Sequence, residues 1–157
     1  KDPGAVAPDG IRESDLNLAQ ALTLKDNLVA LGYQVGFTRT SDEYVNLRER
    51  IRLARNMGAK IFLSVHHDTP TATRAGVYYS LHPLSKDLAA MVQAALPGAW
   101  TLPSSASRFG RLYIDDFPGP AILIEFGPTG PVSREERIAR ARAVAAPVAQ
   151  WARSAQV

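Results

Sequence analysis

Two short apolar runs end in ionisable side chains, and this feature limits the possible folds of the chain more than any other. The run IFLSVHHDT ends with His66, His67 and Asp68, and the run PAILIEFG carries Glu125 near its end. Continuous apolar runs of this length are typical of strands that are covered on both faces, as in a parallel sheet. Because helical patterns alternate with the runs, we expect one α/β domain with a mixed, mostly parallel sheet flanked by helices.

Turn residues and helix caps divide the rest of the chain into elements. Ser14 and Asp15 are candidate caps of a first helix, and the sequence SREE, which begins at Ser133, matches a capping box ahead of a long last helix. We expect helices over residues 14–31, 41–58, 85–96 and 134–154. We expect strands over residues 33–39, 60–66, 76–82, 111–115 and 120–127, and an exposed loop over residues 97–110.

The composition excludes several kinds of chemistry. The chain has 157 residues, which suits one domain, and it contains no cysteine, so thiol nucleophiles, thiolate metal sites and disulfides are excluded. The formal charge is +3, and the basic residues are scattered over helical patterns, which gives little support to nucleic-acid binding. No apolar run approaches the roughly 20 residues that span a bilayer, so we expect no membrane span.

The carboxylate inside PAILIEFG needs an explanation, because burying an unpaired charge is unfavourable. In open α/β sheets, ligands bind beyond the carboxyl ends of the strands, which is where His66 and Glu125 are both expected. Two interpretations follow. Either Glu125 pairs with an arginine and His67 only caps its strand, or the strand ends form a metal site with an adjacent general base.

Strand geometry separates the two adjacent histidines. Neighbouring residues on a strand point to opposite faces, so His66 and His67 cannot both bind one metal while the strand stays regular. His66 shares its face with Ser64 and Asp68, and His67 shares the other face with Val65. Because both faces are apolar, periodicity alone leaves open which histidine is the ligand.

Three segments resemble successive blocks of a known family. The segments ESDLNLAQAL, LGYQVGFTRTSDEYVNLRERIRLARNMGAKIFLSVHHD and PAILIEFG are similar to the zinc-dependent N-acetylmuramoyl-L-alanine amidases of the type 3 family, in the same order and over nearly the whole chain. The resemblance implies a phosphorylase/hydrolase-like fold, as in zinc carboxypeptidases. It also implies a zinc hydrolase that cleaves the amide between N-acetylmuramic acid and L-alanine in peptidoglycan.

The resemblance also implies roles for individual residues. Glu13 matches a glutamate that binds zinc, His66 matches a histidine ligand, and Glu125 matches the catalytic glutamate beside the metal. His67 stands where the family commonly has alanine, and Asp68 replaces a common asparagine. We expect these two residues to contact the substrate or the groups that hold the ligands.

One part of the family pattern is missing. The family's first histidine ligand lies in a D-P-G-H-G-G-like loop after the opening strand, whereas residues 2–5 read DPGA and resemble a segment that follows that loop. We therefore expect residues 1–157 to be an amidase catalytic domain without its first strand and histidine loop. The third zinc ligand is then expected upstream of Lys1.

The resemblance further implies a monomer that acts on peptidoglycan or muropeptides in the cell envelope, either in the periplasm or outside the cell. The sequence leaves two other functions open. One is a wall-binding or regulatory domain that kept the fold and lost catalysis, and the other is a zinc carboxypeptidase-like peptidase. The presence of Glu13, His66 and Glu125 together favours the enzyme, because a decayed site has no reason to keep a buried carboxylate.

Overall fold

Four strands form one sheet in the computed structural model, which describes residues 2–157. Their order across the sheet is β1 (Phe62–Asp68), β4 (Ala121–Pro128), β2 (Gly76–Tyr79) and β3 (Trp100–Pro103). β1 and β4 are parallel, as are β2 and β3, whereas β2 and β4 are antiparallel. The expected mixed, mostly parallel sheet is therefore confirmed.

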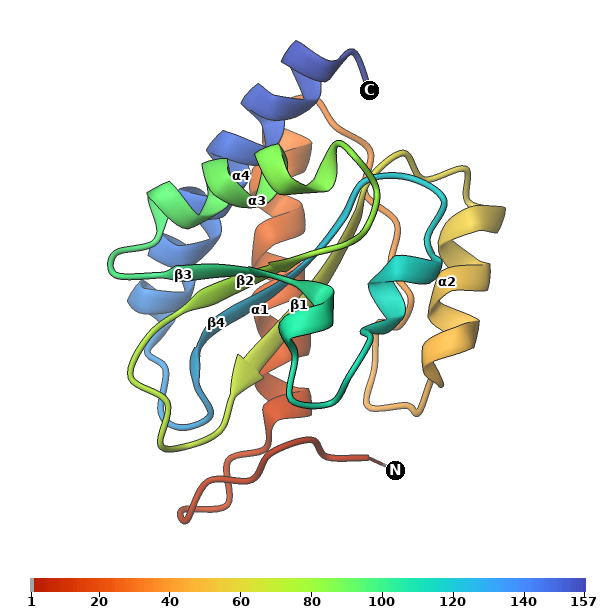
Figure 1. The fold of residues 1–157 in the computed structure, drawn as a ribbon. Coiled ribbons are helices and arrows are strands. Elements are labelled where there is room, and N and C mark those ends of the chain that lie inside the picture. Colours follow the sequence, from red (N-terminus) through yellow and green to blue (C-terminus); the bar gives the residue numbers. More distant parts are fainter. Residues whose placement is uncertain (1) are drawn as a thin grey trace.

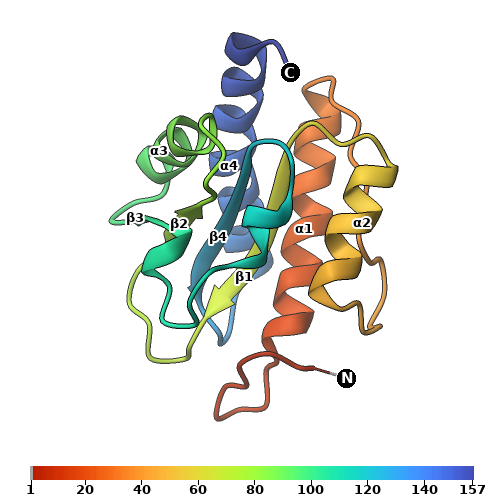
Figure 2. The same ribbon diagram turned by 45° about the vertical axis from the view of Figure 1, so that its right-hand side comes forward.

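Helices cover both faces of the sheet (Figures 1 and 2). One face packs against α1 (Glu13–Ala30), α3 (Ser85–Ala95) and α4 (Arg134–Ala155), and Figure 1 shows α1 and α4 behind the strands. The other face packs against α2 (Leu47–Asn56) and the 3-10 helix η2 (Tyr113–Asp116). A second 3-10 helix, η1 (Ser104–Ala106), follows β3. No helix in the described part of the chain is both long and apolar enough to span a membrane.

Alternating residues of β4 supply two separate cores. Ile122, Ile124 and Phe126 pack with α1, α3 and α4, whereas Ala121 and Leu123 pack with α2 and η2. All five side chains are buried. Burial on both faces explains why this part of the sequence shows no apolar–polar alternation.

Helix starts follow from capping side chains. The hydroxyl of Ser133 accepts a hydrogen bond from the Glu136 N–H at 3.1 Å, which confirms the capping box that begins α4. α2 begins later than residue 41, because the Asn46 side chain caps it by accepting a bond from the Glu49 N–H at 2.9 Å. α1 begins at Glu13 without a side-chain cap, so the prediction that Ser14 caps it is wrong.

Three predicted elements differ in the structure. Residues 97–110 were expected to be a loop, but Trp100–Pro103 forms β3 because it pairs with β2. Residues 111–115 were expected to be a strand, but the last three of them begin η2, where the Asp115 carboxylate accepts bonds from the Leu81 N–H and the Ser104 hydroxyl. Residues 33–39 were also expected to be a strand, yet they have no strand partner.

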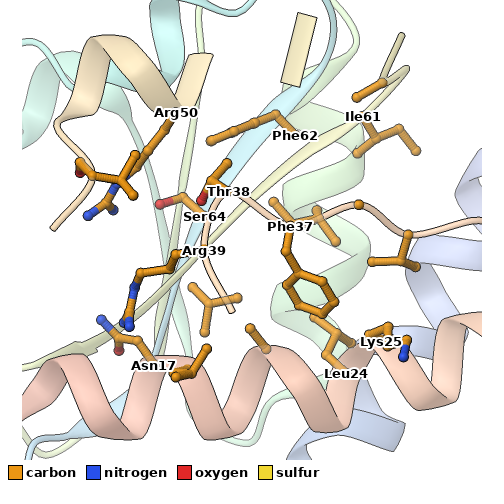
Figure 3. A pocket seen from close by; sticks show the side chains of 18 of the residues that line it. Asn17, Leu24, Lys25, Phe37, Thr38, Arg39, Arg50, Ile61, Phe62 and Ser64 are labelled. Atoms are coloured by element: carbon orange, nitrogen blue, oxygen red, sulfur yellow. The ribbon is translucent and has the colours of Figure 1, made fainter. Parts of the chain in front are cut away.

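A cavity of about 880 Å³ separates residues 33–39 from β1. It extends from Ile61, the residue before β1, to His66 near the end of the strand. α1 lines one side of it. Figure 3 shows Asn17 and Leu24 of α1, residues 37–39, and Phe62 and Ser64 around it. The cavity therefore lies where a strand that pairs with residues 33–39 would have to run.

The cavity exposes one edge of β1. The Phe62 N–H points toward β4, since it donates to the Pro120 carbonyl at 3.1 Å. Because N–H groups alternate in direction along a strand, those of Leu63 and Val65 point toward the cavity. Within residues 2–157, neither forms a backbone bond with residues 33–39. The outer edge of β1 is therefore free to pair.

Hydrogen exchange tests this free edge. In residues 1–157, the amides of Leu63 and Val65 are expected to exchange at least about tenfold faster than those of Phe62 and Ser64, which face β4. Residue-resolved exchange by NMR measures the difference, and the β4 amides serve as the protected reference. Equal protection of the two sets would contradict an open edge.

Candidate active site

His66 and Glu125 meet at the carboxyl ends of two parallel strands. They are register partners on β1 and β4, so their side chains leave the same face of the sheet on strands about 4.8 Å apart. This is the face covered by α2 and η2, and both residues lie beyond the apolar contacts of that core. The topology thus places an imidazole beside a carboxylate at the edge where α/β proteins bind ligands.

Glu13 reaches the same point from the first turn of α1. Its Oε1 lies 3.0 Å from Nδ1 of His66, and its Oε2 accepts a hydrogen bond from the Ala5 N–H at 3.0 Å. The Glu13 N–H donates in turn to the Ala5 carbonyl at 2.8 Å. Gly4 allows this close packing, because its φ is +68° and a Cβ there would collide with the Glu13 carboxylate.

The two carboxylates of the site have opposite pKa shifts. Burial alone would raise the pKa of Glu13, but hydrogen bonding and charge from His66, with bonds from Ala5 and Asn17, lower it to about 2. Burial raises the pKa of Glu125 to about 7; the electrostatic interaction with His66 opposes this shift, and the negative charge of Asp68 adds to it. Glu13 is therefore an anion at neutral pH, while Glu125 is close to its midpoint.

Two buried polar atoms at the site lack a partner. Nε2 of His66 and Oε2 of Glu125 are buried without a hydrogen bond among the described residues. The 3.0 Å separation between His66 Nδ1 and Glu13 Oε1 suits a direct hydrogen bond. An imidazole nitrogen and carboxylate oxygens are also the types of donor that would hold a zinc ion.

The described residues supply an incomplete ligand set. Nowhere in residues 2–157 do three or more histidine, aspartate or glutamate side chains gather in a way that could hold a metal ion. Glu13 and His66 supply two donors, whereas zinc sites normally take three or four protein ligands.

His67 turns away from this site. Its side chain is 2% exposed and stacks on Phe126, with ring centroids 6.0 Å apart, on the face covered by α1 and α4. Nδ1 of His67 lies 2.8 Å from Oδ1 of Asn17, whose amide donates to Oε1 of Glu13 at 3.2 Å. His67 is therefore buried and contacts Asn17, which is bonded to the proposed ligand Glu13.

Burial also sets the ionisation of His67. It lowers the pKa of the imidazole to about 4, and the positive charge of Arg140 adds to this shift. His67 is therefore neutral at pH 7, and the Asn17–Glu13 contact next to it carries no extra positive charge.

Asp68 closes the end of β1. Pairing with β4 shifts register between His66 and Asp68, and the Asp68 carbonyl then accepts two bonds from Thr129, from the N–H at 2.8 Å and the hydroxyl at 2.7 Å. The Asp68 carboxylate accepts a bond from the Thr69 N–H at 2.7 Å. Asp68 therefore orders the loop after β1.

Asn17 and Gly4 are the site residues that sequence reasoning missed. Asn17 follows Glu13 by four residues, which places both on one side of α1, so the spacing in ESDLN contained the signal. The requirement for Gly4 depends on how residues 2–5 fold against α1, and the sequence alone does not show this.

The sequence pattern of the family described as N-acetylmuramoyl-L-alanine amidase matches residues 1–150. The chain belongs to this family. Amidase AmiC of Neisseria meningitidis is 40% identical over 81 residues, and the sporulation-specific amidase of Bacillus subtilis is 43% identical over 67 residues. These matches cover 50% and 41% of this chain but only 20% and 26% of the two relatives, so the chain spans about a quarter of their length or less.

Solved amidase structures have the same fold. The amidase Ami1 of Mycobacterium smegmatis superposes with a TM-score of 0.80 at 22% identity, over 96% of this chain and 82% of the other. The amidase AmiC2 of Nostoc punctiforme superposes with a TM-score of 0.75 at 22% identity, over 97% and 91%. The expected architecture, a sheet flanked by helices in one amidase-like domain, is thereby confirmed.

The raised pKa of Glu125 predicts a pH-dependent stability. The folded-state pKa of about 7 lies above the ordinary value of 4.5, so the favourable contribution of the protonated group is complete below about pH 4.5 and is lost as pH rises through 7. In the presence of chelator, Glu125→Gln is therefore expected to stabilise the fold at pH 8 by on the order of 2 kcal/mol and to change little at pH 4. Denaturant unfolding at the two pH values measures this.

The exposed Glu135→Gln variant is the matched control, because it removes a carboxylate from the surface of α4. It should change stability by less than about 0.5 kcal/mol at either pH. A Glu125→Gln variant that is no more stable than wild type at pH 8 would show that burial of the ionised Glu125 carboxylate does not destabilise the fold.

Proposed function

We propose that this chain is the catalytic domain of a zinc-dependent amidase that cleaves the bond between N-acetylmuramic acid and L-alanine in peptidoglycan. The observation that carries the proposal is the convergence of Glu13, His66 and Glu125 at the carboxyl ends of β1 and β4, in a chain whose family match covers residues 1–150. The proposed metal ligands are Glu13 and His66, and the proposed catalytic residue is Glu125.

The residues divide the chemistry between them. The chemistry that zinc supplies when bound is the activation of water and the polarisation of the scissile carbonyl. Glu125 accepts the proton of the attacking water and returns it to the leaving amine. A pKa of about 7 suits both transfers at neutral pH. Glu13 stays anionic, held by Ala5 and Asn17, and is ready to bind a cation.

We propose that one further extended segment occupies the cavity beside β1 and completes the domain. The backbone N–H groups of Leu63 and Val65 on β1 face the cavity and are free to pair. Apolar residues of α1 and of residues 33–39 line the cavity, among them Leu24, Val35 and Phe37. A segment that adds to a sheet edge in this way binds through backbone hydrogen bonds and fits through alternate side chains.

The position of Asp2 gives the direction of this segment. Asp2 lines the cavity together with Glu13 and His66, at the carboxyl end of β1. We propose that the segment lies alongside β1 and leads into Asp2, so that it finishes at that end and runs parallel to β1. The loop after it then lies beside Glu13 and His66, and we propose that this loop supplies the third zinc ligand.

The substrate class suggests where the enzyme works. Peptidoglycan lies outside the cytoplasmic membrane, so action in the cell envelope or outside the cell is proposed. We also propose that the chain acts as a monomer, because the catalytic groups all come from one copy of it.

Loss of Glu125 should stop turnover without loss of metal. Protein that includes the upstream segment is expected to release stem peptides from purified sacculi, and Glu125→Gln should lower the rate by at least about a hundredfold, the scale of general acid–base catalysis. Mass spectrometry of the products identifies the bond cut, and metal analysis shows whether zinc is retained. Glu135→Gln is the control. Intact sacculi after treatment with the zinc-loaded wild type would overturn the amidase proposal.

Metal affinity tests the proposed third ligand separately. Protein with the upstream segment is expected to bind about one zinc per chain, and residues 1–157 alone to bind it at least about tenfold more weakly, since two donors remain. Calorimetric titration with zinc measures both affinities. In the longer protein, Glu13→Ala should weaken binding while Glu135→Ala should not. Equal affinity of the long and short proteins would contradict the proposed loop.

A further inference from the structure

Four residues form one row across the whole sheet. His66 on β1 is the register partner of Glu125 on β4, Glu125 is the partner of Gly76 on β2, and Gly76 is the partner of Trp100 on β3. Register partners project from the same face of a sheet. The row therefore runs from the proposed metal ligand to the proposed base, then across a residue without a side chain to a tryptophan.

The indole of Trp100 fills the place that a side chain at Gly76 would take. A Cβ built on Gly76 would collide with the six-membered ring of Trp100. The indole therefore leans over β2 toward Glu125, which brings an aromatic surface within one strand spacing, about 4.8 Å, of the β4 backbone. Trp100 remains partly exposed in this position.

Neighbouring side chains fix the indole. The ring of Tyr78 meets it edge-on, with centroids 4.8 Å apart and an interplanar angle of 67°. The backbone N–H of Trp100 donates to the Ala75 carbonyl at 3.2 Å, which holds the start of β3 against the residue before β2. An aromatic surface held in this way loses little conformational entropy when it binds a ligand.

We propose that Trp100, supported by Tyr78, is a saccharide subsite that binds the N-acetylmuramoyl ring next to the bond to be cut. This rests on the proposed amidase function. One face of a pyranose ring presents C–H groups, and these pack on an indole as an apolar surface. A sugar packed on the indole, which covers Gly76, extends its lactyl group past the ring toward Glu125 and His66.

The chemistry of this surface favours the sugar over the stem peptide. The peptide carries amides and carboxylates, which need hydrogen-bond partners or cations when they lose water. In this row the indole covers Gly76, so the surface next to Glu125 is the apolar face of the indole.

Tryptophan fluorescence tests the subsite without turnover. The chain contains two tryptophans, and Trp151 is buried in α4, so Trp151→Phe leaves Trp100 as the only indole. In the Trp151→Phe, Glu125→Gln protein, N-acetylmuramoyl-L-alanyl-D-isoglutamine is expected to change the emission of Trp100. The peptide L-alanyl-D-isoglutamine, which lacks the sugar, is expected to leave it unchanged.

Kinetics on sacculi tests the same residue in the protein that includes the upstream segment. Trp100→Ala is expected to raise KM between about threefold and tenfold, the scale of one aromatic contact, with a smaller change in kcat. Trp100→Phe should keep most of the affinity. Leu102→Ala is the matched control, because Leu102 lies two residues along β3, is 40% exposed and should leave KM unchanged.

The possible outcomes separate this inference from the amidase proposal. Equal fluorescence responses to both probes, or no response to the sugar-containing one, would overturn the subsite while active protein still supports the amidase. Equal rises in KM for Trp100→Ala and Leu102→Ala would also overturn it. A response to the sugar-containing probe, together with intact sacculi after treatment with the zinc-loaded wild type, would support the subsite and reject the amidase. If Trp100→Ala does not fold, an unchanged KM for Leu102→Ala and a modest rise for Trp100→Phe support the inference.

Discussion

Burial of β4 on both faces is the constraint on which the rest of this structure depends. Ile124 and Leu123 serve different cores from adjacent positions, and the helices on each side are placed by those contacts. The same burial reaches Glu125 at the end of the strand, where it opposes ionisation and holds a carboxyl group near its midpoint at neutral pH. β4 therefore contributes both to the stability of the fold and to the reactivity of the site. At Glu125 the two requirements conflict, because the burial that raises its pKa makes the ionised carboxylate unfavourable.

The two adjacent histidines act on a single carboxylate from two sides of the sheet. His66 contacts Glu13 directly on one face, whereas His67 contacts Asn17 on the other face, and Asn17 donates to Glu13. The backbone N–H of His67 also approaches Oε1 of Glu13, at 3.4 Å. Strand alternation, which prevents the pair from sharing a metal, is what allows it to hold one ligand in place.

Strong local signals predicted part of the fold and of the site. β1, β4, α3 and α4 follow from continuous apolar runs, helical periodicity and the capping box at Ser133, and the positions of His66 and Glu125 at strand ends follow with them. Elements that depend on a partner were predicted less well. Trp100–Pro103 becomes a strand by pairing with β2, and residues 33–39 do not become one because the space beside them has no strand in it.

Side-chain roles that depend on tertiary contact were also beyond the sequence. The position of the Trp100 indole is set by the absence of a side chain at Gly76, which is distant in the chain. The burial of His67 is set by the docking of α1 against β1. In both cases the residue type is visible in the sequence, but its neighbour is not.

The cavity beside β1 has a consequence for the colloidal behaviour of the protein. An open strand edge is normally a template for edge-to-edge association with another sheet. Here residues 33–39 lie on the far side of the cavity, next to that edge. Residues 33–39 therefore oppose the lateral approach of a second folded sheet. Residues 33–39, which do not form a strand, thus shield the open edge of β1 from association with another sheet.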